Sequence, residues 1–89
     1  MTQSLTAVQL ESIDCLQLYT IAQLIMREWK TMNNYAKQYA NAMLFLNSVD
    51  DMYGQEDGRT IVRYFLSNAG TWRGDTARIV KAELNRRVK

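Results

Sequence analysis

The hydrophobic positions of this sequence recur mainly with the period of an α-helix. Between residues 13 and 26, ten of fourteen positions are apolar. Leu18, Ile25 and Trp29 fall on one face when this segment is drawn as a helix. The spacing therefore predicts a long helix over residues 13–32, whose broad apolar surface needs cover on more than one side.

Further helices are predicted on both sides of this segment. The expected elements are a short helix over residues 7–12 capped by Ser4 or Thr6, a helix begun by Asn33-Asn34, a capped turn over 48–51, a loop over 52–58, a helix over 59–69 closed by Gly70, and a last helix over 72–88 capped by Thr71. The expected inward-facing residues are Tyr35, Tyr39, Met43 and Leu46, then Ile61, Val62, Phe65, Leu66 and Ala69, and finally Trp72, Thr76, Ile79, Val80, Leu84 and Val88.

The composition agrees with a helical chain. There is no proline and there are four glycines, which favours helices joined by short turns. We expect an all-α fold, a compact four- to five-helix bundle or orthogonal helical domain, with residues 1–89 in a single domain. The first residues lack a basic region and a cleavage site, and no apolar stretch approaches the ~20 residues of a membrane span, so we expect a cytoplasmic protein.

The residue types that carry most catalytic and metal chemistry are scarce. The chain has no histidine, the commonest general base and transition-metal ligand. Its one cysteine, Cys15, lies in the apolar segment, where a thiol is expected to be inert packing. The isolated glycines form no phosphate-binding loop. We expect no enzyme activity, no metal site and no cofactor.

Four carboxylates crowd the segment between the central helices, namely Asp50, Asp51, Glu56 and Asp57. Their spacing does not match a calcium-binding loop. Helix capping and solvated ion pairs are the favoured interpretation, because Asp50 and Asp57 stand where a helix begins. A partner contact, a metal site and a small hydrolase using Asp50 or Asp57 are the alternatives.

Charge is divided unevenly along the chain. Residues 1–58 hold three basic and seven acidic side chains, whereas residues 59–89 hold eight basic and two acidic ones. The last helix carries the basic residues Arg78, Lys81, Arg86, Arg87 and Lys89. Such a stripe can be stabilised by the helix dipole and keep the domain soluble. Alternatively, it can dock on an acidic protein or follow nucleic-acid phosphates. No clear helix-turn-helix accompanies it.

The last third of the chain contains a series of short motifs. In order they are Tyr53-Gly54, Asp57-Gly58, Val62-Arg63-Tyr64-Phe65-Leu66-Ser67-Asn68-Ala69, Trp72-Arg73-Gly74-Asp75, Ala77-Arg78 and Lys81-Ala82-Glu83-Leu84. The series resembles a C-terminal signature of small uncharacterised bacteriophage and prophage proteins. In physical terms, we expect Trp72 to pack on Phe65, Gly70 to take a left-handed conformation, and Gly74 to make room for a neighbour.

The resemblance implies a phage-type interaction protein. We expect it to bind and inhibit a host macromolecular complex, as an anti-CRISPR or another anti-defence inhibitor does, with a CRISPR effector as one candidate partner. The alternative is a small basic nucleic-acid-binding protein, repressor- or nucleoid-like, that uses the C-terminal helix. The candidate partner-binding residues are Arg73, Arg78, Lys81, Arg86, Arg87, Tyr53, Asp50 and Asp51.

Self-association is a separate expectation. Leu16, Tyr19, Gln23 and Met26 run along the edge of the long helix opposite its main apolar stripe. A second apolar edge requires a second layer of cover, which favours a two-fold dimer. The alternative is a central helix that the other helices of the same chain surround.

Overall fold

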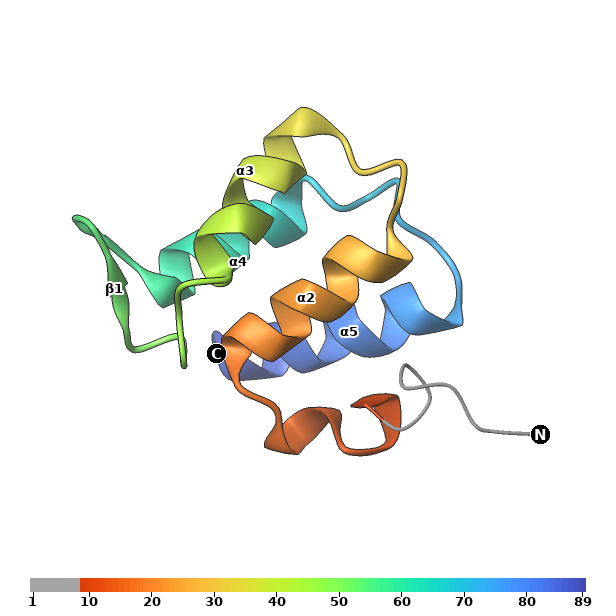
Figure 1. Cartoon of the computed structure of the whole chain (residues 1–89), viewed down its shortest axis with the longest axis horizontal. Helices are drawn as coiled ribbons and strands as arrows, with labels where there is room; N and C mark the ends of the chain where they lie inside the picture. Colours follow the sequence, from red (N-terminus) through yellow and green to blue (C-terminus); the bar gives the residue numbers. More distant parts are fainter. Residues whose placement is uncertain (1–8) are drawn as a thin grey trace.

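Two pairs of antiparallel helices make up most of the fold (Figure 1). The computed structural model describes residues 9–89. Its elements are the 3-10 turn η1 (Ile13–Cys15), α2 (Leu18–Glu28), α3 (Asn34–Met43), the strands β1 (Met52–Tyr53) and β2 (Glu56–Asp57), α4 (Gly58–Ser67) and α5 (Asp75–Arg87). Helix α3 packs along α4, and α2 contacts α3 and runs alongside α5. The prediction of a compact, mainly helical fold is confirmed.

The prediction of one long helix over residues 13–32 is wrong, because the chain leaves helical geometry at Leu16–Gln17 and again at Trp29. Leu16 and Gln17 are extended, so that the turn η1 and the helix α2 are separate elements. Residues 13–26 are apolar on nearly all sides of a helix, so a straight helix over this range would expose some of its apolar side chains. The break lets Ile13 fold back so that it is buried together with Leu18. The helix predicted over residues 7–12 is seen as a helical turn at 9–11, and its caps Ser4 and Thr6 lie outside the described residues.

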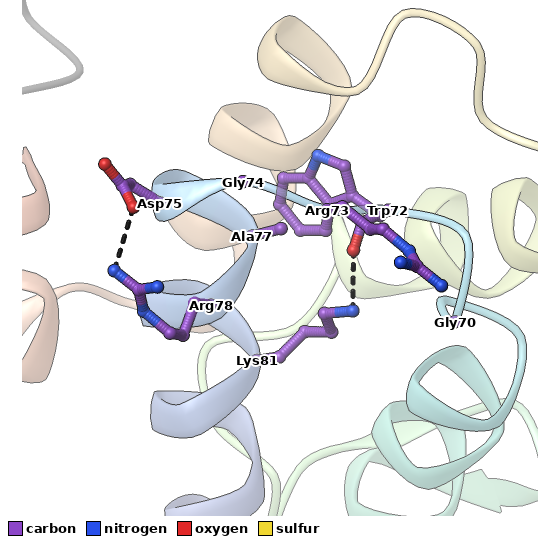
Figure 2. Close-up of a pocket in the computed structure, with 8 residues that line it drawn as sticks. All are labelled: Gly70, Trp72, Arg73, Gly74, Asp75, Ala77, Arg78 and Lys81. Carbon is purple, nitrogen blue, oxygen red and sulfur yellow. Dashed lines mark hydrogen bonds and ion pairs between the residues drawn. The ribbon is translucent and has the colours of Figure 1, made fainter.

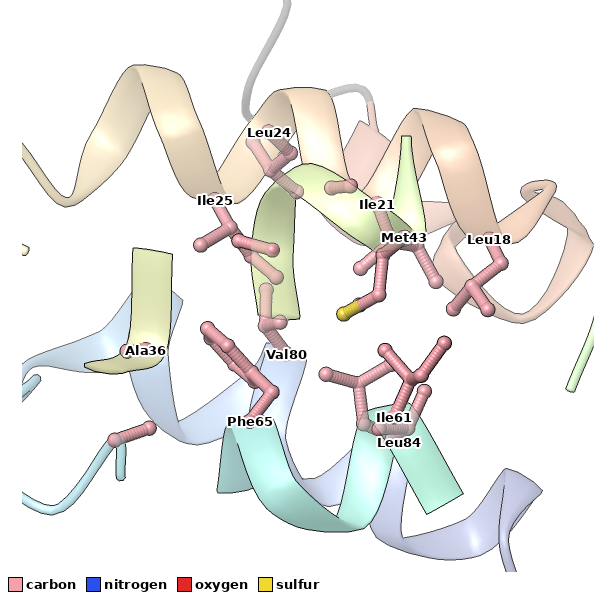
Figure 3. Packing of buried hydrophobic residues seen from close by; sticks show 14 of the residues in the cluster. Leu18, Ile21, Leu24, Ile25, Ala36, Met43, Ile61, Phe65, Val80 and Leu84 are labelled. Carbon is pink, nitrogen blue, oxygen red and sulfur yellow. The ribbon is translucent and has the colours of Figure 1, made fainter. Parts of the chain in front are cut away.

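The core is filled by side chains from all four long helices (Figure 3). Its largest fully buried members are Leu18, Ile21, Leu24, Ile25, Met43, Leu46, Val62, Phe65, Val80 and Leu84. Helix α3 turns Ala36 and Ala40 toward this core, and their small side chains let α3 approach α4 closely. Tyr35 and Tyr39, which were expected to face the core, are displaced outward as a result. Tyr39 is half-buried and Tyr35 is 70% exposed.

Two predicted helix starts are confirmed by their side-chain caps. The Asn33 side-chain oxygen accepts a hydrogen bond from the Ala36 N–H at 2.9 Å. The Asn33 amide also donates to the Asn68 carbonyl oxygen at 3.0 Å, which ties the start of α3 to the end of α4. Asp57 caps α4 in the same manner by accepting from the Thr60 N–H at 2.7 Å.

The segment predicted as a loop over residues 52–58 is a small antiparallel hairpin, β1–β2. The turn before it is capped as predicted, because the Asp51 carboxylate accepts from the Asn47 and Ser48 N–H groups at 2.8 and 3.2 Å. Gly58 then brings the chain against this turn. A Cβ atom on Gly58 would lie 2.9 Å from the Ser48 carbonyl oxygen, so the contact depends on glycine.

The connection between α4 and α5 differs from the prediction at several residues. Gly74, with φ of 112°, is the left-handed residue there, and Gly70 is not one. Nothing lies within 4 Å of a Cβ placed on Gly74, so its backbone conformation, and not space for a neighbour, requires glycine. Helix α5 begins at Asp75, and Thr71 does not cap it.

The aromatic contacts of the core centre on Trp29, and the inner face of α5 differs from the prediction at Ile79. The ring of Trp72 stacks on Trp29 with a centroid distance of 5.4 Å, and Trp29 in turn meets Phe65 edge-on at 6.2 Å. Trp29 thus makes ring contacts with both Trp72 and Phe65. Ile79, expected to face inward, lies partly exposed on the outer side of α5 because the inward positions go to Ala77, Val80 and Leu84.

None of the helices described between residues 9 and 89 combines the length and hydropathy needed to cross a membrane.

Candidate interaction surfaces

Lys81, one of the predicted partner-binding residues, stabilises the connection between α4 and α5. Its ammonium group donates hydrogen bonds to the carbonyl oxygens of Ala69 at 2.9 Å and Trp72 at 2.7 Å. Figure 2 shows the side chain directed at the Trp72 carbonyl. The Ala69 carbonyl also accepts from the Trp72 N–H at 3.1 Å within this turn, and Lys81 adds a charged donor to both carbonyls. Its charge is therefore largely committed to the fold.

Arg86 and Arg87 are held by a carboxylate of their own helix. Glu83 is 7% exposed and accepts from Arg86 at 3.0 and 2.5 Å and from Arg87 at 2.6 Å. Hydrogen bonds from Arg86 are the main reason that the pKa of Glu83 is lowered, with Arg87 adding to the effect against partial burial. Arg87 also donates to the Ile13 carbonyl oxygen at 2.8 Å.

The remaining basic candidates lie nearer to solvent. Arg78 pairs with Asp75 at 2.8 Å, and both side chains are exposed. Arg73 is exposed as well, at the rim of an open hollow of about 510 Å³ that Trp72, Ala77 and Lys81 also line (Figure 2). Arg73 and Arg78 thus present charge to solvent, whereas Lys81 and Arg87 are held inward. The predicted cationic stripe is not one continuous charged face.

The acidic candidates are distributed over the turn and the hairpin. Asp51 and Asp57 act as caps, and the Thr60 hydrogen bond lowers the pKa of Asp57. Asp50 pairs with Arg59 at 3.1 Å, and Glu56 is exposed on β2. Capping and solvated ion pairs, the favoured interpretation, account for three of the four carboxylates. Within residues 9–89, no three potential ligand side chains gather closely enough to hold a metal ion.

Large apolar side chains lie at the end of the molecule that carries the capped turn and the hairpin. Phe45 is 75% exposed, Met52 59% and Tyr53 45%. The rings of Phe45 and Tyr53 lie against each other with a centroid distance of 5.8 Å. The hairpin that carries Met52 and Tyr53 projects beyond the α3–α4 pair (Figure 1). We call these three residues the hairpin-end cluster.

Tyr53 is one of the residues predicted from the sequence to bind a partner, whereas Phe45 and Met52 are not. The exposure of Phe45 follows from the end of α3, because the chain leaves helical geometry after Met43. Leu46 then turns inward and Phe45 outward. Without the exact end of α3, the apolar run around Phe45 was indistinguishable from core.

A second group of aromatic side chains lies along α3 and α4. Tyr39 and Tyr64 are in contact, with ring centroids 5.3 Å apart, and Tyr35 is one helical turn from Tyr39. Tyr39 is half-buried in this contact, whereas Tyr35 and Tyr64 are exposed. No carboxylate of the capped turn or the hairpin belongs to this group, so its exposed Tyr35 offers a comparison with the hairpin end.

The residues predicted for self-association are partly covered by the chain itself. Leu16 and Met26 are half-buried against the core, and the Gln9 side chain accepts a hydrogen bond from Arg27 nearby on α2. Tyr19 and Gln23 keep solvent exposure. The single chain thus supplies part of the second layer of cover, which weakens the argument for a dimer without testing it.

Cys15 is exposed, which corrects its expected role as buried packing. It is the last residue of η1, and the break at Leu16–Gln17 turns it away from the core that a continuous helix would have let it join.

Comparisons with protein-family models, with curated proteins and with solved structures found no match for this chain. The resemblance of its C-terminal motifs to phage proteins therefore stays an expectation from the sequence.

Proposed function

We propose that the protein acts by binding another protein through the hairpin-end cluster, and not by catalysis. The observation that carries this proposal is the exposure of three large apolar side chains at the hairpin end, Phe45, Met52 and Tyr53, of which the rings of Phe45 and Tyr53 are in contact. Single exposed apolar residues are ordinary, but a contiguous group is typical of contact surfaces. Aromatic residues are also favoured at the centres of protein interfaces.

The biological role that we propose is inhibition of a host complex by a phage-encoded protein, as an anti-CRISPR or another anti-defence inhibitor. This part of the proposal is supported by the resemblance of the C-terminal motifs, from Tyr53-Gly54 to Lys81-Ala82-Glu83-Leu84, to phage and prophage proteins. An inhibitor of this kind needs a contact surface and no reactive group, and the chain contains no histidine.

The alternative proposal, nucleic-acid binding by α5, has less support. It requires basic side chains that are available to phosphates. Of the predicted basic candidates, Lys81 and Arg87 are committed to backbone carbonyls and Arg86 and Arg87 to Glu83, which leaves Arg73 and Arg78 facing solvent. A gel shift at ~50 mM salt tests this alternative, because binding that depends on phosphates is strongest at low salt.

Affinity capture from a bacterial host lysate tests the protein-binding proposal. The bait is used in three forms: unmodified, with the double substitution Phe45→Ser/Tyr53→Ser, and with Tyr35→Ser as the matched control. Tyr35 is also highly exposed but lies outside the hairpin end. We expect one protein complex that the unmodified chain and the Tyr35 variant retain and the double variant loses. Equal capture by all three forms, or no specific capture by any, would contradict the proposal.

A further inference from the structure

We propose that the hairpin end binds a cationic partner: a protein segment with arginine or lysine side chains around an apolar centre. This inference rests on the proposed function, since it assigns the chemistry of the partner at the same surface. Two independent features of the hairpin end, its carboxylates and its exposed aromatic rings, favour a cation.

The charge around the hairpin-end cluster is negative. Residues 44–60 contain four carboxylates and a single basic residue, Arg59. Asp50 precedes the Met52–Tyr53 strand and Glu56 pairs with Tyr53 on the neighbouring strand. Both are exposed, and Asp50 keeps 77% of its side chain accessible although it pairs with Arg59. An arriving guanidinium or ammonium group can therefore reach a carboxylate at the edge of the apolar cluster.

The aromatic rings supply the second attraction. Phe45 and Tyr53 lie tilted at 37° to each other, and both are exposed to solvent. The face of an exposed aromatic ring attracts a cation, and arginine can stack on it. Met52, between the carboxylates, is a flexible side chain that adapts to varied apolar surfaces.

Two other occupants fit this end of the molecule less well. Nucleic acid would bring phosphates toward Asp50 and Glu56, which repel them. A second copy of the chain offers fewer cations, because Lys81 and Arg87 are held by their own backbone carbonyls and by Glu83. Of the predicted cationic candidates, Arg73 and Arg78 face solvent, and Arg78 pairs with Asp75. A basic amphipathic segment of another protein satisfies both the carboxylates and the apolar cluster.

The test uses two synthetic helical peptides as probes. They share length and apolar residues, and their polar positions carry arginine and lysine in one and glutamate in the other. Each is titrated into the isotopically labelled protein while amide chemical shifts are followed. We expect only the cationic peptide to bind, with shifts concentrated in residues 45–59 and with an affinity that falls as salt rises.

Charge-reversal variants locate the interaction. Glu56→Lys should weaken binding of the cationic peptide at least fivefold. Glu11→Lys is the matched control, because it makes the same change of charge at an exposed carboxylate outside the hairpin. The control should bind as the unmodified protein does. Phe45→Ser should also weaken binding, since it removes one of the two exposed rings.

Three results would overturn the inference: equal binding of both peptides, shifts outside the hairpin end, or no binding of the cationic peptide at millimolar concentration. Failure here is distinguishable from failure of the proposed function. If Glu56→Lys still captures the host complex while Phe45→Ser/Tyr53→Ser does not, the hairpin end is the contact surface and its partner is not cationic.

Discussion

The guanidinium of Arg87 donates a hydrogen bond to the carbonyl oxygen of Ile13, 2.8 Å away and 74 residues earlier in the chain. The same side chain pairs with Glu83, so one residue joins the C-terminal helix to the turn that precedes α2. A basic residue that looks available in the sequence is therefore part of the fold.

Arg87→Ala should destabilise the protein, and Arg78→Ala should not. Arg87 has 14% of its side chain accessible, and its removal takes a charged donor from the Ile13 carbonyl and from the Glu83 carboxylate, which keep the Leu16 N–H and Arg86 as their other donors. The expected loss is about 2 kcal/mol, or a melting temperature lower by about 10 °C. Arg78 pairs only with exposed Asp75, so its removal should cost less than about 0.5 kcal/mol. Thermal melts of both variants check the contrast, and equal melting temperatures would contradict it.

Glu83 should make stability fall at acid pH. Its pKa is lowered in the folded protein, mainly by the Arg86 hydrogen bonds, and so lies below the unfolded value of about 4.3. The ionised carboxylate thus stabilises the fold above that pH, and the contribution is lost as pH falls through the folded pKa.

Glu83→Gln isolates this contribution from those of other carboxylates such as Asp57, whose pKa is also lowered. The variant should melt at a lower temperature than the unmodified protein at pH 7, and the gap should narrow between about pH 5 and pH 3. Melting curves over this range provide the measurement. A gap independent of pH would show that the charge of Glu83 does not stabilise the fold.

Gly58→Ala should destabilise the junction of the hairpin and α4. The added Cβ would lie 2.9 Å from the Ser48 carbonyl oxygen and 3.0 Å from the Val49 Cα and oxygen atoms, all backbone. We expect a loss of about 1–3 kcal/mol in the free energy of unfolding. Gly70→Ala is the control, because nothing lies within 4 Å of its Cβ position and its φ is not positive. Denaturant unfolding should show the control unchanged or slightly more stable, and an equal loss in both variants would refute the steric argument.

The oligomeric state follows from the cover of α2. Leu18, Ile21, Ala22, Leu24 and Ile25 are all fully buried within one chain. Because Leu16 and Met26 are partly covered too, we expect a monomer, the alternative to the dimer that the sequence favours. Light scattering at high concentration measures the mass. A dimeric mass that Tyr19→Lys reduces to a monomeric one would instead establish the contact along α2.

Local signals explain which parts of the fold could be predicted. Asn33 and Asp57 cap helices through hydrogen bonds to residues three positions ahead, so the sequence around them was sufficient. The break at Leu16–Gln17 and the outward rotation of Tyr35 depend on packing between helices, which an apolar pattern does not specify. Both were missed for that reason.

The candidate site was less predictable than the fold. Lys81 and Arg87 were chosen for their charge, but their acceptors at Ala69 and Ile13 lie 12 and 74 residues away in the sequence. Conversely, Phe45 was not chosen, because its exposure depends on where α3 ends. Charge and hydrophobicity indicate the kinds of contact available, whereas tertiary structure decides which side chains remain accessible.

Site-specific photo-crosslinking tests the central claim, contact with a protein at the hairpin end, most directly. A benzophenone-bearing amino acid is placed at position 45 in one variant and, as control, at position 79 on α5, where Ile79 is also partly exposed. After irradiation in the host cytoplasm, we expect position 45 to form a covalent adduct with one protein and position 79 to form none. An adduct from position 79 alone, or one with nucleic acid, would contradict the account.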